Sequence, residues 1–381
     1  MPNRRQFLKT ASVSVGAAAA AAQIPLRSIS VAEEIPVTPH FNVIPRWRGF
    51  NLLQYFQAFG DGRNKEVVPE FDGKLIRDLG FNFVRLPMDY WNWIDTDWRR
   101  TRRIEPDDMY KIKEPFLENL DQSIENLNRC GIHVSLNLHR APGYCVNDPA
   151  RESCSLWKDK HAEDAFVFHW EMLAKRYKGI SPELLSLNLV NEAPSVHPGM
   201  SEEDYTRVMA RATEAIRKIS PEKTVIIDGL NYGNIVAKEM IPAKVAQSVH
   251  AYTPFHLTHY RTSWGDRNND FPYPTWPILD QNGNTVWNHQ KLEEHYAPWG
   301  RLVRQGIGVH CGEAGCYKNT PHKVFLAWLR DTMEILKSHD IGYAIWEFRG
   351  TFGVIDSGRA DVDYEDWHGV KLDREMLKLL I

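Results

Sequence analysis

Residues 184–194, Leu-Leu-Ser-Leu-Asn-Leu-Val-Asn-Glu-Ala-Pro, form the stretch that decides which fold we expect. It opens with a largely apolar run, as in a strand that is buried on both faces of a parallel sheet. The run stops at Asn191 and Glu192, and Pro194 follows. Because the carboxyl ends of the strands form the active-site face of a parallel barrel, the stretch predicts a rigid strand that presents Glu192 to a cleft.

A second stretch has the same organisation. Residues 306–315, Gly-Ile-Gly-Val-His-Cys-Gly-Glu-Ala-Gly, form a short apolar segment that ends at Glu313 between glycines, which let backbone or substrate come close. Either glutamate alone could equally be a capping residue or a solvated loop charge. Two carboxylates at strand ends are the arrangement that glycoside hydrolases use for their acid and their nucleophile.

The composition narrows the class of protein. The chain of 381 residues is 43% hydrophobic and 25% charged, which is typical of a globular protein with one large or two small domains. The net charge of -3 gives no basic field, so nucleic acid and an anionic membrane are not expected partners. The 13 Trp and 14 Tyr residues include rings that could stack on sugars, although most of them are expected in the core.

The five cysteines have no CxxC or CxxH spacing, so we expect no metal site. Cys145 and Cys154 lie in one loop rich in Pro, Asn and Ser, and they could form a disulfide if the protein is exported. Cys130 and Cys311 lie in apolar segments and are expected to be buried, unreactive thiols. The sequence therefore predicts a Cys145–Cys154 bridge, no metal and no cofactor.

Residues 1–32 are predicted to be a signal peptide that is removed. Residues 3–9, Asn-Arg-Arg-Gln-Phe-Leu-Lys, precede a mildly apolar Ala-rich run and resemble a twin-arginine export signal, and residues 30–32 offer a cleavage site. The run is too short and too weakly apolar to span a bilayer. A disordered N-terminus with a chance arginine pair is the alternative. Export in the folded state predicts a periplasmic or extracellular protein.

After a lead-in segment at residues 33–45, strands and helices alternate along the chain. Apolar runs predict strands at residues 47–52, 81–87, 132–139, 184–190, 224–229, 245–250, 306–313 and 342–348. Amphipathic patterns predict helices at residues 67–79, 115–129, 162–177, 201–219, 289–305, 320–339 and 373–380. Roughly eight strand–helix units without internal repeats predict a single (β/α)8 TIM barrel over residues 46–381. Trp-rich loops at residues 91–106 and 255–288 are expected to wall its cleft.

Polar and aromatic residues recur at the predicted strand ends. In chain order they are Arg85, His139, Asn191, Glu192, His250, Tyr252, Glu313 and Trp346. This ordered set resembles glycoside hydrolase family 5, the cellulase family of clan A, over nearly all of the chain after about residue 45. In that family the acid/base usually lies in an Asn-Glu-Pro motif, whereas here Ala193 separates the glutamate from the proline. Residues 364–373 also resemble the tail of some members.

The resemblance implies a catalytic pair. Glu192 would be the general acid/base and Glu313 the nucleophile of a retaining mechanism, in which the two carboxyl groups lie about 5 Å apart. Arg85 and Tyr252 would donate to Glu313 and keep its pKa low. Partial burial and the neighbouring negative charge would raise the pKa of Glu192.

The resemblance also implies residues that bind and orient. Asn191 would hydrogen-bond the sugar 2-hydroxyl, and Trp346 would be the ring on which that sugar stacks. His139 and His250 would orient the carboxylates and hydroxyls. These residues, with Arg85 and Tyr252, complete the expected substrate-binding set.

The function expected from these residues is a secreted retaining endo-β-1,4-glucanase, acting as a monomer on a polysaccharide or oligosaccharide. β-Mannanase, xyloglucanase and exo-β-1,3-glucanase activities of the same family stay open. A metal-dependent barrel hydrolase with His139 and His250 as ligands is a different class, and the lack of a His-x-His motif argues against it. A non-catalytic carbohydrate-binding barrel is a third class of protein. Such a barrel would not need paired carboxylates, so their presence argues against it.

Overall fold

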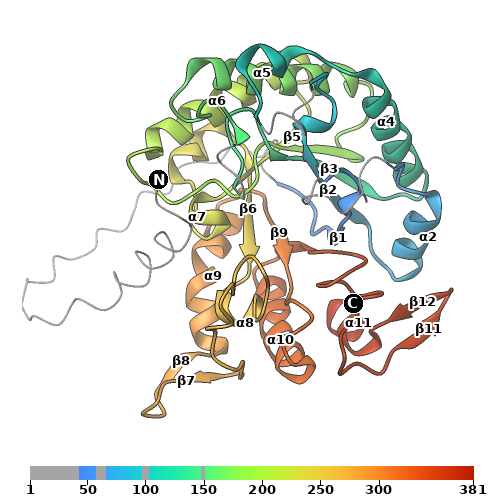
Figure 1. Cartoon of the computed structure of the whole chain (residues 1–381), viewed down its shortest axis with the longest axis vertical. Coiled ribbons are helices and arrows are strands. Elements are labelled where there is room, and N and C mark those ends of the chain that lie inside the picture. The colour runs from blue at the N-terminus through green and yellow to red at the C-terminus, as the bar shows by residue number, and fades with distance from the viewer. Residues whose placement is uncertain (1–42, 57–65, 97–102, 147–150) are drawn as a thin grey trace, which may run out of the picture. The chain divides into compact units, whose positions relative to one another are not determined.

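The structure is a computed structural model that describes residues 43–56, 66–96, 103–146 and 151–381. Within these residues, eight parallel strands close a barrel in the order β1-β10-β9-β6-β5-β4-β3-β2, and helices surround it (Figure 1). The predicted single (β/α)8 TIM barrel is confirmed. The predicted signal peptide at residues 1–32 and most of the lead-in segment lie outside the described residues.

The predicted strands and long helices all occur close to their expected bounds. The barrel strands are β1 (Arg48–Asn51), β2 (Phe83–Asp89), β3 (His133–Arg140), β4 (Leu185–Asn188), β5 (Thr224–Asp228), β6 (Ala246–Ala251), β9 (Val309–Ala314) and β10 (Gly342–Ile345). The helices are α2 (Glu70–Asp78), α4 (Glu114–Arg129), α5 (Lys160–Arg176), α6 (Glu202–Ile219), α7 (Leu230–Gly233), α8 (Phe255–Thr258), α9 (His289–Arg304), α10 (His322–Ser338) and α11 (Arg374–Leu380). Short 3-10 turns are η1 (Leu53–Tyr55), η2 (Tyr90–Asn92), η3 (Pro106–Tyr110) and η5 (Lys238–Ala243).

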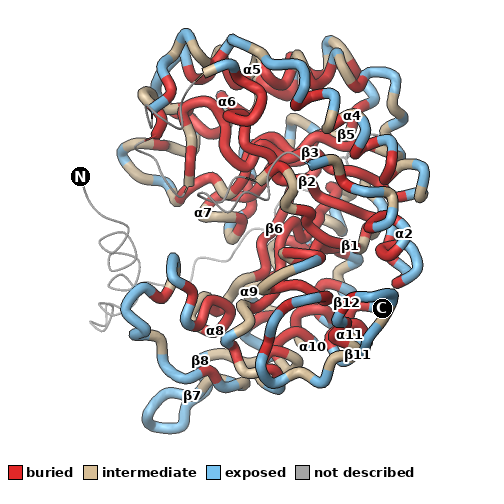
Figure 2. Tube along the Cα trace, turned by 45° about the vertical axis from the view of Figure 1, so that its right-hand side comes forward, coloured by how far each residue is buried: buried red, intermediate tan, exposed pale blue. Residues whose placement is uncertain are grey.

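Burial explains why the strands have apolar sequences. Every residue of β2, β3, β4 and β9 is buried, and Figure 2 shows buried residues along the barrel strands. Helices cover the outer face of the sheet, so both faces of these strands lie away from solvent. No helix among the described residues combines the length and the apolar character needed to cross a bilayer.

Helix α6 shows how local sequence signals and packing agree. Its N-terminus has a capping box, in which the Ser201 hydroxyl accepts from the Asp204 N–H and the Asp204 carboxylate accepts from the Ser201 N–H. Tyr205, on the buried face, donates its hydroxyl proton to the carbonyl of Asp228. The helix is thereby fixed to the carboxyl end of β5.

The strand register brings two polar residues together. The pairing of β6 with β9 shifts between Val249 and His250, and after the shift His250 pairs with Glu313. A register shift moves every later side chain relative to the neighbouring strand. It therefore places a histidine directly beside a predicted catalytic carboxylate.

Aromatic rings close the amino end of the barrel. The rings of Trp47 and His133 stack with centroids 3.8 Å apart, and Phe83 packs on His310 at 4.4 Å. These side chains lie at the starts of their strands, so they form a layer across the barrel from the predicted catalytic residues. The amino end of the barrel is therefore filled by a packed layer of aromatic rings that includes two histidines.

Two small hairpins were not predicted. Strands β7 (Ile278–Leu279) and β8 (Thr285–Trp287) pair within the long 255–288 segment, and β11 (Glu365–Trp367) pairs with β12 (Val370–Leu372). The turn of the second hairpin has φ values of 48° at His368 and 81° at Gly369. Positive φ at both central residues is the requirement of a type I′ hairpin turn, so Gly369 was a usable signal.

The predicted disulfide is wrong, because Cys145 and Cys154 are both free thiols in the structure. Cys145 is buried close to the Arg140 guanidinium. Burial and the nearby Glu152 carboxylate raise the pKa of Cys154 to about 11. The two thiols share a loop in the sequence, but each packs against a different charged neighbour.

Candidate active site

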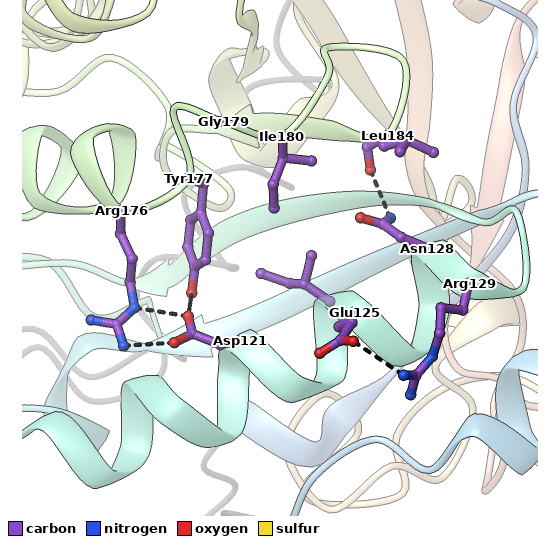
Figure 3. A pocket seen from close by; sticks show the side chains of 10 residues that line it. Asp121, Glu125, Asn128, Arg129, Arg176, Tyr177, Gly179, Ile180 and Leu184 are labelled. Carbon is purple, nitrogen blue, oxygen red and sulfur yellow. Dashed lines mark hydrogen bonds and ion pairs between the residues drawn. The ribbon is translucent and has the colours of Figure 1, made fainter.

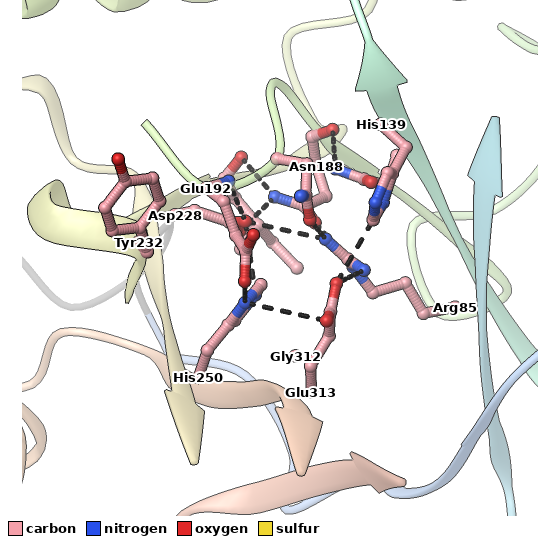
Figure 4. A network of polar contacts seen from close by, with 12 residues as sticks. Arg85, His139, Asn188, Glu192, Asp228, Tyr232, His250, Gly312 and Glu313 are labelled. Atoms are coloured by element: carbon pink, nitrogen blue, oxygen red, sulfur yellow. Dashed lines mark hydrogen bonds and ion pairs between the residues drawn. The ribbon is translucent and has the colours of Figure 1, made fainter. Parts of the chain in front are cut away.

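The carboxyl ends of the barrel strands bring the two predicted carboxylates into one site (Figure 4). Glu192 follows β4, and Glu313 lies on β9. One oxygen of each side chain and a ring nitrogen of His250 all lie within 4.8 Å of one another. A retaining pair of carboxyl groups is about 5 to 5.5 Å apart and an inverting pair about 6.5 to 9.5 Å, so the spacing fits the retaining arrangement.

Both oxygens of Glu313 accept hydrogen bonds. Arg85 Nη1 donates to Oε1 at 2.7 Å, and the Tyr252 hydroxyl donates to Oε2 at 2.9 Å. The side chain is only 5% exposed. The expected contacts of Arg85 and Tyr252 are therefore present, and they leave the carboxylate little rotational freedom.

The pKa of Glu313 departs from the prediction. Burial raises the pKa of Glu313, and the positive charges of His250 and Arg85 limit the rise. The predicted low pKa is wrong in direction. The sequence indicates which cations lie near a carboxylate, but it does not show how completely the site excludes water.

Glu192 has an unusual backbone conformation with a φ of 50°. Its N–H donates to Asp228 Oδ2 at 3.0 Å, and its carbonyl accepts from the Tyr144 hydroxyl at 2.5 Å. Its side chain is 21% exposed. Glu192 is thus fixed at its main chain while its carboxyl group can reach solvent, as a group that exchanges protons must.

Arg85 is the centre of the buried polar network. Its guanidinium is 1% exposed and lies among oxygen atoms from four strands or strand ends. Besides Glu313, its acceptors are Asn188 Oδ1 at 2.9 Å, Asn51 Oδ1 at 3.1 Å, Asn191 Oδ1 at 2.8 Å and Asp228 Oδ2 at 3.5 Å. The fork geometry of arginine allows one side chain to orient all of these groups at once.

Asn191 is oriented by that network. Because Arg85 can only donate, the side-chain oxygen of Asn191 must face it, and the amide nitrogen points elsewhere. This Nδ2 donor is buried and has no hydrogen-bond partner among the described residues. It is available to a hydroxyl group of a bound ligand.

An aromatic wall borders the carboxylates. The Trp346 ring stacks on His139 with centroids 5.3 Å apart and an interplanar angle of 24°. Phe56 packs edge-on against both rings, at 4.8 Å from His139 and 5.4 Å from Trp346. Burial and the charges of Arg140 and Arg85 lower the pKa of His139 well below its usual value, so this histidine is neutral. The wall offers an apolar ring face beside the predicted catalytic pair.

His250 lies between three carboxylates. Its Nδ1 is 3.1 Å from Glu192 Oε1 and 3.9 Å from Glu313 Oε2, and its Nε2 is 3.2 Å from Asp228 Oδ2. Burial disfavours the charged ring, but the negative charges of Glu313 and Asp228 outweigh it and raise the pKa of His250 to about 10. His250 is therefore a buried cation. A protonated imidazole has no lone pair for a metal ion, so a metal at this cluster would have to displace the His250 proton.

The expected residues all converge at the site, but the prediction missed Asn51, Asn188 and Asp228. Each is at least 98% buried and contacts Arg85. Asn51 and Asp228 are the last residues of β1 and β5, so the rule that identified the other strand-end residues would have found them. Asn188 is the last residue of β4 in the structure, but in the sequence the apolar run continues through Leu189 and Val190, so no polar stop marked it.

A separate pocket of about 640 Å³ lies between α4 and the segment that follows α5 (Figure 3). There, Arg176 and Tyr177 both donate to the Asp121 carboxylate. The pocket is lined by residues that lead into β3 and β4 and contains none of the predicted catalytic residues. We therefore do not assign the reaction to it.

The chain belongs to glycoside hydrolase family 5, since residues 45–351 match the family described as cellulase (glycosyl hydrolase family 5). It is an O-glycosyl hydrolase of a family that retains the anomeric configuration, which agrees with the spacing of Glu192 and Glu313. The family suggested by the strand-end residues is confirmed.

Several known proteins are similar to this chain. A solved structure described as a glycoside hydrolase is 39% identical with a TM-score of 0.80, covering 88% of this chain and 98% of that chain. Endoglucanase Cel5A from Thermotoga maritima is 22% identical with a TM-score of 0.68, covering 88% and 97%. Endoglucanase C of Acetivibrio thermocellus is 25% identical over 344 residues, which are 83% of this chain and 95% of that protein.

Proposed function

We propose that this glycoside hydrolase is an endo-β-1,4-glucanase that uses Glu313 as nucleophile and Glu192 as general acid/base. The observation that carries the assignment is the pair of carboxylates whose oxygens lie within 4.8 Å of each other. Glu313 is the buried, hydrogen-bonded member, and Glu192 is the member that reaches solvent. This asymmetry matches the two roles, because a nucleophile must be held still and an acid/base must exchange its proton.

The two carboxylates divide the reaction into two steps. Glu313 attacks the anomeric carbon while the glycosidic oxygen takes a proton from Glu192, so that the leaving sugar departs and a glycosyl ester forms. Glu192, now ionised, removes a proton from an incoming water, and the water displaces Glu313 from the sugar. Asn191 Nδ2 would donate to the 2-hydroxyl, and Trp346 would stack beneath the same sugar.

The substrate assignment rests on similarity to named relatives. Endoglucanase C of Acetivibrio thermocellus carries a name that refers to a glucan. Cellodextrinase A of Ruminococcus flavefaciens, which is 23% identical over 77% of this chain, carries a name that refers to cellodextrins. The aromatic wall of Trp346 and Phe56 supports a sugar-ring ligand.

We also propose that residues 1–32 direct export by the twin-arginine route and that residues 46–381 act as a monomeric catalytic domain in the periplasm or outside the cell. The arginine pair at residues 4 and 5 before an Ala-rich run supports this. Replacing both Arg4 and Arg5 by Lys should retain the protein in the cytoplasm. Unchanged export of that variant would contradict the proposal.

The catalytic proposal is tested by a hydrolysis panel of β-1,4-glucan, β-mannan, xyloglucan and laminarin, with product analysis. We expect the glucan to lose viscosity faster than it gains free monosaccharide, and proton NMR to show that the first product keeps the β configuration. Glu313→Gln is the matched control that removes the nucleophile without changing its size. Release of monosaccharide alone, or an inverted first product, would contradict the proposal.

A further inference from the structure

We propose that Asp228 is a positioning residue of the reaction, which fixes both the main chain of Glu192 and the His250 ring that orients its carboxyl group. Asp228 neither touches the reacting atoms nor belongs to the set expected from the sequence. The proposal rests on the acid/base role of Glu192 proposed above.

Asp228 is a buried carboxylate with every partner inside the site. It is the last residue of β5 and is fully buried. Its Oδ1 accepts from Asn188 Nδ2 at 2.9 Å, and its Oδ2 lies 3.5 Å from Arg85 Nη2. Burial would raise the pKa of Asp228, but the charges of His250 and Arg85 and the bond from Asn188 lower it to about 2. The group is therefore a permanent negative charge at this end of the barrel.

The first role of Asp228 concerns the main chain of Glu192. A residue other than glycine with a φ of 50° is strained by about 1 to 2 kcal/mol, because Cβ approaches the carbonyl oxygen. The Glu192 N–H donates to Asp228 Oδ2 at 3.0 Å, and a hydrogen bond to a buried carboxylate is about twice as strong as a neutral one. Asp228 thus holds the backbone conformation that aims the Glu192 side chain.

The second role passes through His250. Both ring nitrogens face carboxylate oxygens, with Nε2 at 3.2 Å from Asp228 and Nδ1 at 3.1 Å from Glu192. The Nδ1 contact is a hydrogen bond and the Nε2 contact is a close ion pair, so a protonated ring is attracted to both carboxylates. Glu313 faces the same Nδ1 at 3.9 Å, and Arg85 contacts both Asp228 and Glu313, so these are the charged groups that set the state of the ring.

A fixed His250 cation decides which oxygen of Glu192 holds the transferable proton. Because His250 Nδ1 donates to Oε1, the proton that Glu192 delivers to the glycosidic oxygen resides on Oε2. His250 keeps its own protons throughout the reaction. The only side-chain proton that is transferred is the one on Glu192. Without the Asp228 charge, the ring could turn neutral and present a lone pair to Glu192.

The test is Asp228→Asn, measured with aryl β-cellobiosides whose leaving groups range from dinitrophenol to phenol. A misplaced acid harms poor leaving groups most, so we expect kcat/KM to fall about 10²-fold for the phenyl substrate and less than about tenfold for the dinitrophenyl substrate. Asp121→Asn is the matched control, since it removes another hydrogen-bonded carboxylate far from the site. It should leave the dependence on leaving group unchanged.

A spectroscopic readout covers the case in which Asp228→Asn does not fold. We expect the nitrogen-15 shifts of His250 in the unmodified protein to show a doubly protonated ring at pH 8. A neutral ring at that pH, or an equal loss of kcat/KM for all leaving groups in Asp228→Asn, would overturn the proposal. If Glu192→Gln itself lacks a dependence on leaving group, the acid/base assignment fails instead.

Discussion

Buried histidines at the two ends of the barrel have opposite charge states. At the amino end, burial lowers the pKa of His133 to about 4 and, with the charge of Arg85, that of His310 to about 3. At the carboxyl end, the pKa of His250 rises to about 10, although burial opposes the change. All three side chains are at least 97% buried, so burial does not explain the difference.

The difference comes from the neighbours of each ring. The nitrogens of His133 bond to the Glu183 carbonyl at 2.8 Å and the Ser186 hydroxyl at 2.9 Å, which are neutral. His250 faces three carboxylates instead. One end of the barrel interior therefore packs neutral rings, whereas the other concentrates charged groups, as functional sites commonly do.

The largest expected effect is at the charged end. Glu313→Gln should lower kcat/KM by a factor on the order of 10⁵ or more, because no other group can form the glycosyl ester. Circular dichroism should show an unchanged fold. Turnover close to that of the unmodified enzyme would mean that the nucleophile lies elsewhere.

His250→Phe would make the carboxyl end resemble the amino end. It removes the nearer of the two cations beside the buried Asp228 carboxylate and leaves only Arg85 at 3.5 Å, and breaking a buried ion pair costs about 3 to 5 kcal/mol. Urea denaturation at pH 7 measures the loss. A loss below about 1 kcal/mol would show that the pair contributes little.

The pH dependence of stability should have opposite signs at the two ends. The pKa of His250 is raised, so its contribution is complete below about pH 6.5 and is lost as the pH rises through about 10. The pKa values of His133 and His310 are lowered, so their contributions are complete above about pH 6.5 and are lost as the pH falls toward 4 and 3. Urea denaturation should show the free energy of unfolding falling by roughly 3 kcal/mol between pH 7 and 10, and this alkaline loss should be absent from His250→Phe. If the unmodified protein and His250→Phe lose the same free energy of unfolding at alkaline pH, a titrating group other than His250 causes the loss.

His133→Phe is the counterpart substitution at the apolar end. The new ring still packs on Trp47, but the Ser186 hydroxyl and the Glu183 carbonyl lose their partner, at a cost of about 1 to 3 kcal/mol. We expect kcat/KM to stay within about threefold. If His133→Phe lost activity without losing stability, the claim that the amino end of the barrel serves only packing would be wrong.

The smallest effect is expected from reduction. Cys145 and Cys154 are free, so a reducing agent should leave the melting temperature unchanged. A native disulfide would contribute about 2 to 4 kcal/mol, and its reduction would lower the melting temperature visibly. Thiol titration of the denatured, unreduced protein supplies the independent count.

The sequence by itself determined the barrel and the two carboxylates that we propose as its catalytic pair. Apolar runs that stop at polar residues mark buried strands and the face at which they end, so Glu192 and Glu313 could be assigned to one site although more than 100 positions separate them in the chain. The same rule would have found Asp228 at the end of β5. These features are local, because the end of a strand is marked by the apolar run and the polar residue that directly follows it in the sequence.

Only the tertiary structure decided the charge states, the register and the pairing of groups. The shift between β6 and β9 that brings His250 beside Glu313, the positive φ of Glu192 and the separation of Cys145 from Cys154 depend on contacts between distant segments. The charge on His250 depends on three carboxylates from three strands or strand ends that meet around a fully buried ring. Burial and electrostatic interaction are properties of the assembled interior, and no single segment carries them.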